Sequence, residues 1–508
     1  MMPATIQQER HVQKVFGPPG TGKTTYLLNM MEKELAQGVP SSNVGYFSFT
    51  RKATTEAKER AQVKFTGLNA DLDFPWFRTL HSLAYRCLGV GNKDLMSPQQ
   101  YLDFAKSAGL ELSIEKGEED YIIHTDHPVL NEINIARIRG QDLRTYYNHS
   151  NMEIEWHHLE YVERCYRHYK QSNGLVDFTD LLERLSEDPK RLPRLEVLII
   201  DEAQDLSRLQ WTIVEQLIGY SQRIYIAGDD DQALYNWAGA DVQSFLALPG
   251  EVKILDQSYR VPASVHKLAN QVVRRIRKRQ EKDWEPRDYN GKVSFYNDHM
   301  DVDITQGEWL IMAATNYMLN GLYDWIKSQG LLFERNGRKS IQETILSAVL
   351  GWETLRKGKE VPFTVVKQIY KYLGSDYIAR GHKTLTKVDP EALYSLASLT
   401  KDHGLLTKKI WHEALTKIGE DKREYIIALL RRKTGLRSEA QIKLSTIHGA
   451  KGGEADNVLL ITDLSGRFAR MYDTDPDALN RLHYVAMTRT RKALHIVYPK
   501  NVRRGFML

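Results

Sequence analysis

The hydrophobic residues of this chain fall into short, nearly continuous runs separated by longer amphipathic stretches. Five such runs, each bounded by turn-forming residues, occur at residues 12–17, 43–50, 195–201, 223–229 and 457–464. Runs of this length without polar alternation are typical of parallel strands that are buried on both faces. The stretches between them, such as 24–38 and 209–220, have helical periodicity. This alternation predicts α/β layers joined by crossover helices.

Two stretches interrupt the alternation. Residues 91–170 and about 339–440 are polar, rich in lysine, arginine and tyrosine, and mainly helical in periodicity. They predict two helical insertions in a chain that is long enough for several domains. The expected division is a first α/β domain at 1–90 and 171–257 with an insertion at 91–170, and a second α/β domain at 258–338 and 441–508 with a reduced insertion at 339–440.

Composition and charge add few constraints. Of the 508 residues, 42% are hydrophobic and 27% are charged, and the net charge is +5. This balance is ordinary for a globular protein, and the small positive excess permits a polyanionic partner without requiring one. Taken singly, each basic cluster is expected to be a solvated helix face. The clusters are 274–282, 408–409, 431–437 and 503–504.

Cysteine content and hydropathy indicate the compartment. Cys87 and Cys165 are too few for a disulfide framework or a cysteine zinc site, which favours a reducing cytosol. The first residues lack the apolar core of a secretory signal, and no apolar run approaches the roughly 20 residues of a membrane span. We therefore expect a cytoplasmic protein without a membrane partner.

The segment GPPGTGKT (17–24) follows a predicted strand and precedes a predicted helix. It fits the phosphate-binding pattern G-x-x-x-x-G-K-[ST] in the required strand–loop–helix context. Glycines let the backbone wrap around phosphates, and successive N–H groups at the helix start bind the anion. Lys23 is expected to reach the β and γ phosphates, and the Thr24 hydroxyl to bind Mg²⁺. The residues expected to hold the nucleotide here are Gly17, Gly20, Thr21, Gly22, Lys23, Thr24 and Thr25.

The segment LIIDEAQD (198–205) supplies a complementary acidic pair at the end of an apolar strand. A carboxylate beside the phosphate loop can hold Mg²⁺ through water, which is the role expected of Asp201. The neighbouring Glu202 is placed to accept a proton from an attacking water. Together the two segments predict hydrolysis of a nucleoside triphosphate.

Further segments occur in a fixed order along the chain and resemble one family. They are SFTRKATTEAKERA (48–61), RTLHSLAY (78–85), DEAQD (201–205), GDDDQALYNWAGAD (228–241), DQSYR (256–260), LSTIHGAKGGEAD (444–456) and LHYVAMTRTR (482–491). With these segments the chain resembles the UvrD/Rep/PcrA-like DNA helicases of superfamily one, from near residue 14 to near residue 495. The resemblance implies two RecA-like P-loop domains, each a parallel sheet flanked by helices, with ATP between them and single-stranded DNA across them.

The resemblance also assigns roles around the nucleotide. It implies that Gln232 senses the γ phosphate, that Tyr259 stacks on the adenine and that Glu454 lies near the ribose. It further implies that Arg260 and Arg489 reach the γ phosphate from the second domain. Arginine suits this task because its planar, permanently charged fork matches phosphoryl oxygens.

For the DNA track, the resemblance implies a set of aromatic, hydroxyl, imidazole and guanidinium groups. Aromatic faces stack on bases without reading sequence, while the polar groups hold backbone phosphates. The set is Phe49, Thr50, Arg51, Thr79, His81, Tyr235, Trp237, Thr446 and His448. A core position remains the alternative for Phe49 and Trp237.

The chain departs from the family pattern at several positions. Thr25 and Ala238 stand where arginines are common, and Gly453 stands where a larger apolar residue is usual. A glutamine that reads the adenine is expected in a longer N-terminal lead, and Gln7, Gln8 or Gln13 only approximate it. The short second insertion and early end predict a compact form of the motor, of the kind that a phage or mobile element could carry.

We therefore predict an ATP- and Mg²⁺-dependent helicase that moves on single-stranded DNA, 3′ to 5′ by resemblance. Its expected partners are single-stranded DNA, junctions with duplex and replication or repair proteins, in a prokaryotic or phage-infected cytosol. A translocase that displaces bound proteins with little unwinding is one alternative. A P-loop switch or scaffold that DNA does not stimulate is another, and an RNA track stays open because stacking does not reject a 2′-hydroxyl.

Overall fold

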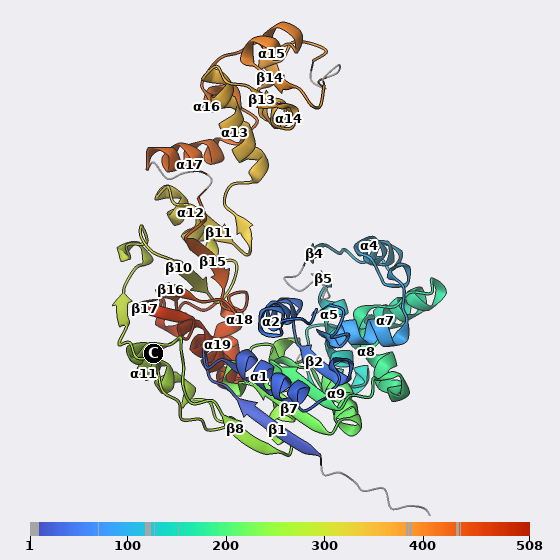
Figure 1. Cartoon of the computed structure of the whole chain (residues 1–508). Coiled ribbons are helices and arrows are strands. Elements are labelled where there is room, and N and C mark those ends of the chain that lie inside the picture. Colours follow the sequence, from blue (N-terminus) through green and yellow to red (C-terminus); the bar gives the residue numbers. More distant parts are fainter. Residues whose placement is uncertain are drawn as a thin grey trace, which may run out of the picture.

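The computed structural model describes residues 10–69, 71–116, 123–125, 127–150, 152–382, 385, 389–432, 436 and 438–508. Gln7, Gln8 and much of the basic cluster 431–437 lie outside these ranges. Two separate sheets, each flanked by helices, form the centre of the molecule (Figure 1). The predicted α/β class with parallel sheets is confirmed.

The first sheet has six parallel strands in the order β3-β2-β6-β7-β1-β8. In chain order they are β1 (His11–Phe16), β2 (Val44–Ser48), β3 (Phe77–Thr79), β6 (Val197–Asp201), β7 (Arg223–Gly228) and β8 (Glu251–Ile254). The helices that cover them are α1 (Lys23–Ala36), α2 (Arg51–Lys64), α3 (Leu80–Leu88), α8 (Phe178–Glu187), α9 (Arg208–Tyr220) and α10 (Val242–Ala247). Because all six strands run in one direction, the segments that follow β1, β2, β6 and β7 meet at one edge.

The second sheet has seven strands in the order β12-β11-β15-β10-β16-β17-β9, and only β12 is antiparallel. They are β9 (Lys292–Tyr296), β10 (Trp309–Ala313), β11 (Phe333–Arg335), β12 (Arg338–Lys339), β15 (Ile442–Thr446), β16 (Ala455–Ile461) and β17 (Thr490–Val497). Their helices are α11 (Ala263–Val273), α12 (Leu319–Ser328), α18 (Gly466–Thr474) and α19 (Pro476–Met487).

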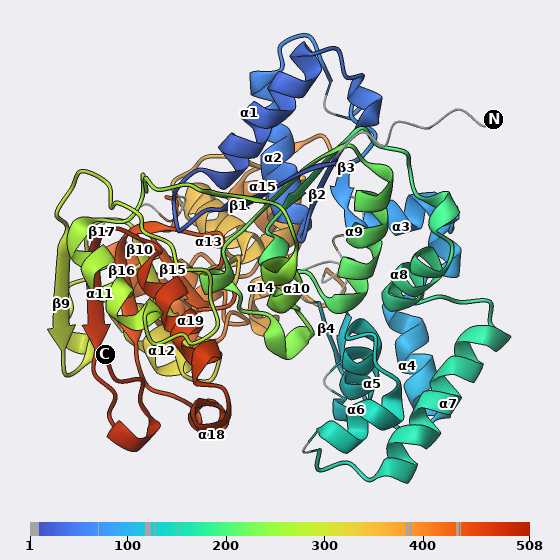
Figure 2. The same cartoon turned by 90° about the horizontal axis from the view of Figure 1, so that it is seen from below.

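The first insertion packs its helices around a small core of its own. It contains α4 (Pro98–Ser107), a short antiparallel pair β4 (Ile114–Lys116) and β5 (Ile123–Thr125), α5 (Pro128–Ile138), α6 (Leu143–His149) and α7 (Trp156–Ser172). In both views it lies beside the first sheet and at the opposite end of the molecule from β9 and β17 (Figures 1 and 2).

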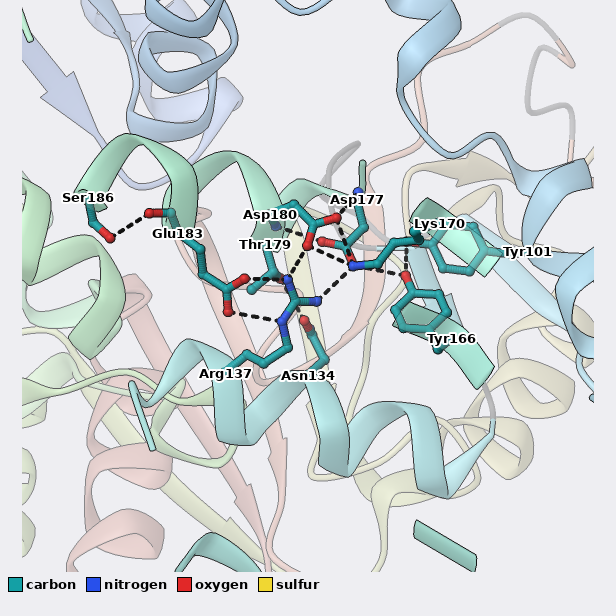
Figure 3. A network of polar contacts seen from close by, with 10 residues as sticks. All are labelled: Tyr101, Asn134, Arg137, Tyr166, Lys170, Asp177, Thr179, Asp180, Glu183 and Ser186. Atoms are coloured by element: carbon teal, nitrogen blue, oxygen red, sulfur yellow. Dashed lines mark hydrogen bonds and ion pairs between the residues drawn. The ribbon is translucent and has the colours of Figure 1, made fainter. Parts of the chain in front are cut away.

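A buried group of charges ties the first insertion to α8 (Figure 3). Lys170 of α7 contacts Asp177 at 2.6 Å and Asp180 at 2.7 Å, and Arg137 of α5 contacts both carboxylates and Glu183 at 2.5–2.8 Å. Asp177 also caps α8, because its Oδ1 accepts a bond from the Asp180 N–H at 2.7 Å. We call these five residues the insertion cluster.

The second insertion projects away from the two sheets (Figure 1). Its elements are α13 (Glu343–Arg356), β13 (Val361–Pro362), α14 (Phe363–Tyr372), β14 (Leu393–Tyr394), α15 (Leu396–Asp402), α16 (Trp411–Ala414) and α17 (Glu420–Arg431). Its core is continuous with one face of the second sheet, since Trp352 and Leu429 belong to the same buried cluster as Ile311 and Leu444.

The prediction that the basic cluster 274–282 is a solvated helix face is wrong in its secondary structure and at Lys282, although Arg274, Arg275, Arg277 and Lys278 are exposed. Helix α11 ends at Val273, so these residues leave the helix, and the Lys282 side chain is 0% exposed. A buried lysine requires compensating carboxylates, and those are supplied from the first sheet, as described below. Over the described residues, no helix is long and apolar enough to cross a membrane.

Candidate nucleotide and nucleic-acid site

The loop between β1 and α1 forms a cradle lined by backbone. Gly20 and Gly22 adopt positive φ angles of 76° and 80°, which glycine accepts without strain. A Cβ on Gly17 would lie 2.1 Å from Lys23 Cγ, so the lysine stem needs the space that glycine leaves. Lys23 Nζ donates to the Gly17 carbonyl at 3.0 Å. The loop therefore already holds the lysine folded across it.

The neighbouring threonines have different surroundings. Thr21 is buried and donates its hydroxyl to the Pro18 carbonyl at 2.8 Å, so it shapes the loop. Thr25 is exposed at the start of α1. Gln13 Oε1 accepts a hydrogen bond from the Tyr26 hydroxyl at 2.8 Å, which occupies the acceptor of the one candidate glutamine that the structure describes.

Asp201 ends β6 directly beside the phosphate loop. Its Oδ2 accepts hydrogen bonds from the Thr24 hydroxyl at 2.9 Å and from the Tyr46 hydroxyl at 2.8 Å. Burial, and secondarily the charge of Glu202, raises the pKa of Asp201. The raised pKa means that nearby cations do not fully compensate the charge of this carboxylate. A buried carboxylate of this kind beside a hydroxyl fits a Mg²⁺ ligand set. Tyr46 was not anticipated from the sequence, because a tyrosine inside an apolar strand has no local signal.

Glu202 follows in a strained backbone conformation. Its φ is 56°, in the left-handed region that residues other than glycine seldom adopt and that is enriched at functional sites. Gln204 Nε2 donates to its Oε2 at 2.6 Å. Burial raises the pKa of Glu202, but Lys23 and then Lys451 outweigh this effect and bring the pKa below its usual value. Glu202 is therefore an ionised carboxylate, as a proton acceptor must be.

Two arginines reach this region from the second sheet. Arg489, between α19 and β17, donates through Nη2 to Gln232 Oε1 at 2.6 Å. Burial and the nearby Arg260 lower the pKa of Arg489 to about 9, so it stays charged at neutral pH. Arg260 forms an ion pair with Glu454, and a Cβ on Gly20 would lie 2.4 Å from Arg260 Cβ. Both arginines thus lie where the two sheets meet.

Tyr259 and Lys451 complete this part of the site. Tyr259 is 74% exposed, while its N–H donates to the Gly20 carbonyl at 2.9 Å. Lys451 was not anticipated as a site residue, although it lies within the quoted segment 444–456. It pairs with Asp205 and donates to the Gln232 carbonyl at 3.0 Å, so it is another cation that joins the second sheet to the first.

Aromatic rings from both sheets gather beside the nucleotide region. Tyr235 lies 5.5 Å from Phe49 and 6.3 Å from His448 between ring centroids, and Trp237 meets His448 edge-on at 5.9 Å. Trp237 is 48% exposed, whereas Phe49 is half-buried against the core of the first sheet. Burial and Lys451 lower the pKa of His448 to about 4, so its imidazole is neutral at pH 7.

The three threonines expected on the DNA track use their hydroxyl oxygens to cap turns. Thr50 and Thr79 accept from the N–H groups of Ala53 at 3.0 Å and Ser82 at 3.2 Å, and Thr446 accepts from Gly449 at 3.1 Å. Thr79 is buried, and its side chain has the structural role of an N-cap.

Two further predicted residues flank these caps. Burial lowers the pKa of His81 to about 4, and its ring meets Phe178 edge-on at 6.2 Å. Arg51 is exposed at the start of α2.

This arrangement defines a P-loop protein in which arginines of one sheet face the phosphate loop of another. Two family models match the chain: the UvrD/REP helicase N-terminal domain over residues 3–253 and the UvrD-like helicase C-terminal domain over residues 382–501. The chain belongs to the UvrD-like helicases of superfamily 1.

Individual relatives are about a quarter identical to this chain over the aligned residues. The ATP-dependent DNA helicase PcrA of Bacillus subtilis (strain 168) is 26% identical over 401 residues, which is 72% of this chain and 52% of that protein. DNA helicase II of Haemophilus influenzae is 26% identical over 361 residues, or 65% and 47% of the two chains. The chain thus spans about half the length of these relatives. A solved arterivirus nonstructural protein 10 helicase with DNA is a distant likeness, 11% identical at a TM-score of 0.35 over 97% of this chain and 62% of that one.

Proposed function

We propose that this chain is an ATP-dependent motor that moves 3′ to 5′ along single-stranded DNA and separates duplex strands. One observation carries the proposal: the segment after β7 joins both halves of the site. Gln232 in this segment binds Arg489 of the second sheet at 2.6 Å. Five residues later, Trp237 presents a half-exposed ring beside His448 of the second sheet. A movement of Gln232 at the γ phosphate can therefore be transmitted along five residues to Trp237, the ring proposed to stack on the bases.

Around the nucleotide, each group has a task that suits its surroundings. Gly17 to Thr25 cradle the phosphates, and Thr24 with Asp201 would hold Mg²⁺, which offsets charge on the β and γ oxygens when bound. Glu202 takes a proton from the attacking water. Arg260 and Arg489 add positive charge from the second sheet as the γ-phosphoryl group leaves. Tyr259, highly exposed, has a free ring face for the adenine.

Along the DNA, stacking supplies grip without sequence preference. Phe49, Tyr235 and Trp237 offer rings from the first sheet, and His448 of the second lies beside Tyr235 and Trp237. Each stacked base contributes about 1–3 kcal/mol. Because the two sheets hold different members of this row, movement of one sheet toward the other on ATP binding shifts one set of contacts against the other, which advances the strand.

Assays of ATP hydrolysis and of unwinding test this proposal. The chain should hydrolyse ATP faster with single-stranded DNA, and Lys23→Ala should lower that rate by about 100-fold or more, since a principal phosphate cation is lost. Duplexes with 3′ tails should be unwound and those with 5′ tails should not. Absence of DNA stimulation would instead identify a P-loop switch. Protein displacement without unwinding would identify a translocase, and stimulation by RNA alone would identify an RNA track.

A further inference from the structure

One buried cation near the nucleotide site has no part in the roles above. Lys282 lies between α11 and β9, on the side of the second sheet, and its side chain is 0% exposed. Its Nζ lies 3.0 Å from Asp229 and 2.8 Å from Asp231, and it also pairs with Asp230. The three aspartates form the turn that follows β7 of the first sheet.

The same turn is held at several other points by the second sheet's side. Arg279 donates to both oxygens of Asp231 at 2.8 Å. Arg481 of α19 donates to the Asp230 carbonyl at 2.9 Å. The three carboxylates offer oxygens within 4.8 Å of one another, a spacing that a cation can bridge, and Lys282 provides that cation. We call Asp229, Asp230, Asp231, Arg279 and Lys282 the joint cluster.

Asp229 connects this cluster to the nucleotide site because its two oxygens have different partners. Oδ1 faces Lys282 at 3.0 Å, and Oδ2 accepts from Gln232 Nε2 at 2.6 Å. An amide that donates through nitrogen to a carboxylate must turn its oxygen the other way. Gln232 Oε1 accordingly faces Arg489, which donates to it at 2.6 Å. The ionised carboxylate thus fixes the orientation of the amide.

The backbone of Asp229 leads toward the proton acceptor. Its N–H donates to Gln204 Oε1 at 3.0 Å, and Gln204 Nε2 donates to Glu202 at 2.6 Å. Burial raises the pKa of Asp229, but Lys282 and then Lys23 outweigh this and bring it below the usual value. Without Lys282, the carboxylate that orients Gln232 would lose its nearest compensating charge.

We propose that Lys282 is a positioning residue for ATP hydrolysis: through Asp229 it holds Gln232 with its oxygen toward Arg489. This inference rests on the proposed function, since it concerns the rate of the same reaction. Lys282 contacts Asp229, and Asp229 contacts Gln232, so Lys282 acts without touching the nucleotide itself.

The test compares Lys282→Met with Lys282→Arg and with Lys278→Met, which removes an exposed lysine four positions earlier. Lys282→Met should lower kcat of DNA-stimulated hydrolysis about 10- to 100-fold, as small misplacements at a reacting centre do, while KM for ATP and binding of an oligo-dT strand change little. Lys282→Arg should restore part of kcat, and Lys278→Met should behave as the parent chain. A residue that only stabilises the fold would lower the melting temperature without this split between kcat and KM.

A second variant guards against misfolding. Lys282→Met combined with Asp230→Asn removes one cation and one carboxylate, so the net charge of the cluster is unchanged. It should melt near the parent temperature and still hydrolyse slowly, because Asp229 lacks its cation. A kcat equal to that of the parent chain in this variant would overturn the inference about Lys282 but not the proposed function. A parent chain that shows no DNA-stimulated hydrolysis would refute both the proposed function and the inference.

Discussion

The joint cluster and the insertion cluster contain the same groups: three carboxylates, one lysine and one arginine. Both are buried, with the lysine side chain 0% exposed in the first and 8% exposed in the second. They differ in the partners of their remaining oxygens. In the insertion cluster, Asp177 also binds the Tyr166 hydroxyl at 2.9 Å and the first turn of α8, so its bonds hold helices together. In the joint cluster, Asp229 caps the short turn that follows it through the Asp231 N–H at 3.2 Å, but its other oxygen binds the Gln232 side chain.

This difference indicates how a role can be assigned to a buried ion pair. Removing one partner from any such pair is costly, so burial alone does not distinguish stability from function. The distinction lies in the third group that shares the carboxylate. Where the further partners of the carboxylate are only helix ends and structural hydroxyls, we expect loss of stability; where one of them is a side chain at the proposed reaction site, we also expect loss of rate.

The largest expected effect on stability is that of Lys170→Met. It leaves the carboxylates of Asp177 and Asp180 facing Arg137 alone, and breaking a buried pair in this way costs about 3–5 kcal/mol. Thermal and urea unfolding should show that loss. Hydrolysis per folded molecule should stay within about twofold, since among the described residues the insertion cluster bonds to α5, α7 and α8 and not to the proposed nucleotide site.

Arg167→Ala is the matched control for Lys170→Met. Arg167 lies on the same helix, is 61% exposed and pairs with Glu163 at 3.5 Å, so its loss should cost under about 0.5 kcal/mol. If Lys170→Met slowed hydrolysis as much as Lys282→Met, the insertion cluster would reach the reaction site and the comparison would fail.

One carboxylate of each cluster, Asp177 and Asp230, should contribute to the pH dependence of stability with opposite sign. Burial raises the pKa of Asp177, but Arg137 and Lys170 outweigh it, so the net pKa is lowered and its stabilisation is lost as pH falls below about 4. Burial outweighs Lys282 at Asp230 and raises its pKa to about 6. A raised carboxyl pKa favours the folded state at low pH, and that contribution is lost as pH rises from about 4 through 6.

Asp230→Asn isolates the second effect. Relative to the parent chain, this variant should become more stable by on the order of 1 kcal/mol between pH 5 and pH 7.5, because it removes the cost of ionising Asp230. Unfolding at several pH values measures the change. Asp177→Asn should show no such gain over this range, and an equal gain in both variants would contradict the electrostatic difference.

The comparison also explains which features could be read from the sequence. The phosphate loop, Asp201 and the five apolar runs depend on residues close in sequence, and the runs correspond to β1, β2, β6, β7 and β16. The Lys282–Asp230 pair joins residues 52 positions apart, and the Lys451–Asp205 pair joins residues 246 apart. Neither pair produces a local sequence pattern, because the sequence around a lysine does not show whether a carboxylate distant in the chain packs against it.

Thr79 shows a related limit at the candidate DNA face. The motif placed it near the track, but the backbone decides what its hydroxyl does, and here it caps α3. The apolar runs do not predict strand β8, because three of its four residues are exposed. The sequence therefore predicts buried strands and contiguous loops well, whereas capping and long-range charge pairing emerge only from the fold.

A smaller effect is expected where the first insertion touches the candidate DNA face. Arg139, two residues beyond the insertion cluster's arginine, donates to the Asn236 carbonyl at 3.3 Å, and a Cβ on Gly239 would lie 2.8 Å from Ile138 Cγ2. The end of α5 thus supports the loop that carries Trp237. Arg139→Ala should raise the concentration of single-stranded DNA that half-activates hydrolysis about threefold, since one modest hydrogen bond is lost.

Arg144→Ala is the control for Arg139→Ala. It removes the same charge from the insertion at a residue whose guanidinium lies 4.3 Å from the Trp156 ring centroid. Equal weakening by both variants would indicate general attraction of DNA to the insertion. In that case support of the loop by Arg139 would not explain the effect.

The smallest expected effect belongs to Arg277, two residues from Arg279 at the rim of the joint cluster. Arg277 is 72% exposed and lies 3.5 Å from Asp477, whereas Arg279 is 13% exposed and binds Asp231 through two nitrogens. The Arg277 guanidinium is largely in water, and the buried Asp477 keeps hydrogen bonds from the backbone N–H groups of Arg277 and Lys278, so Arg277→Ala should cost under about 0.5 kcal/mol and leave kcat unchanged. Arg279→Ala should cost more, because the Arg279 side chain is itself mostly buried and both of its hydrogen bonds to Asp231 are lost. If the two losses of stability were equal, burial would not decide what a charge contributes here, and the ranking of both clusters would have to rest on geometry alone.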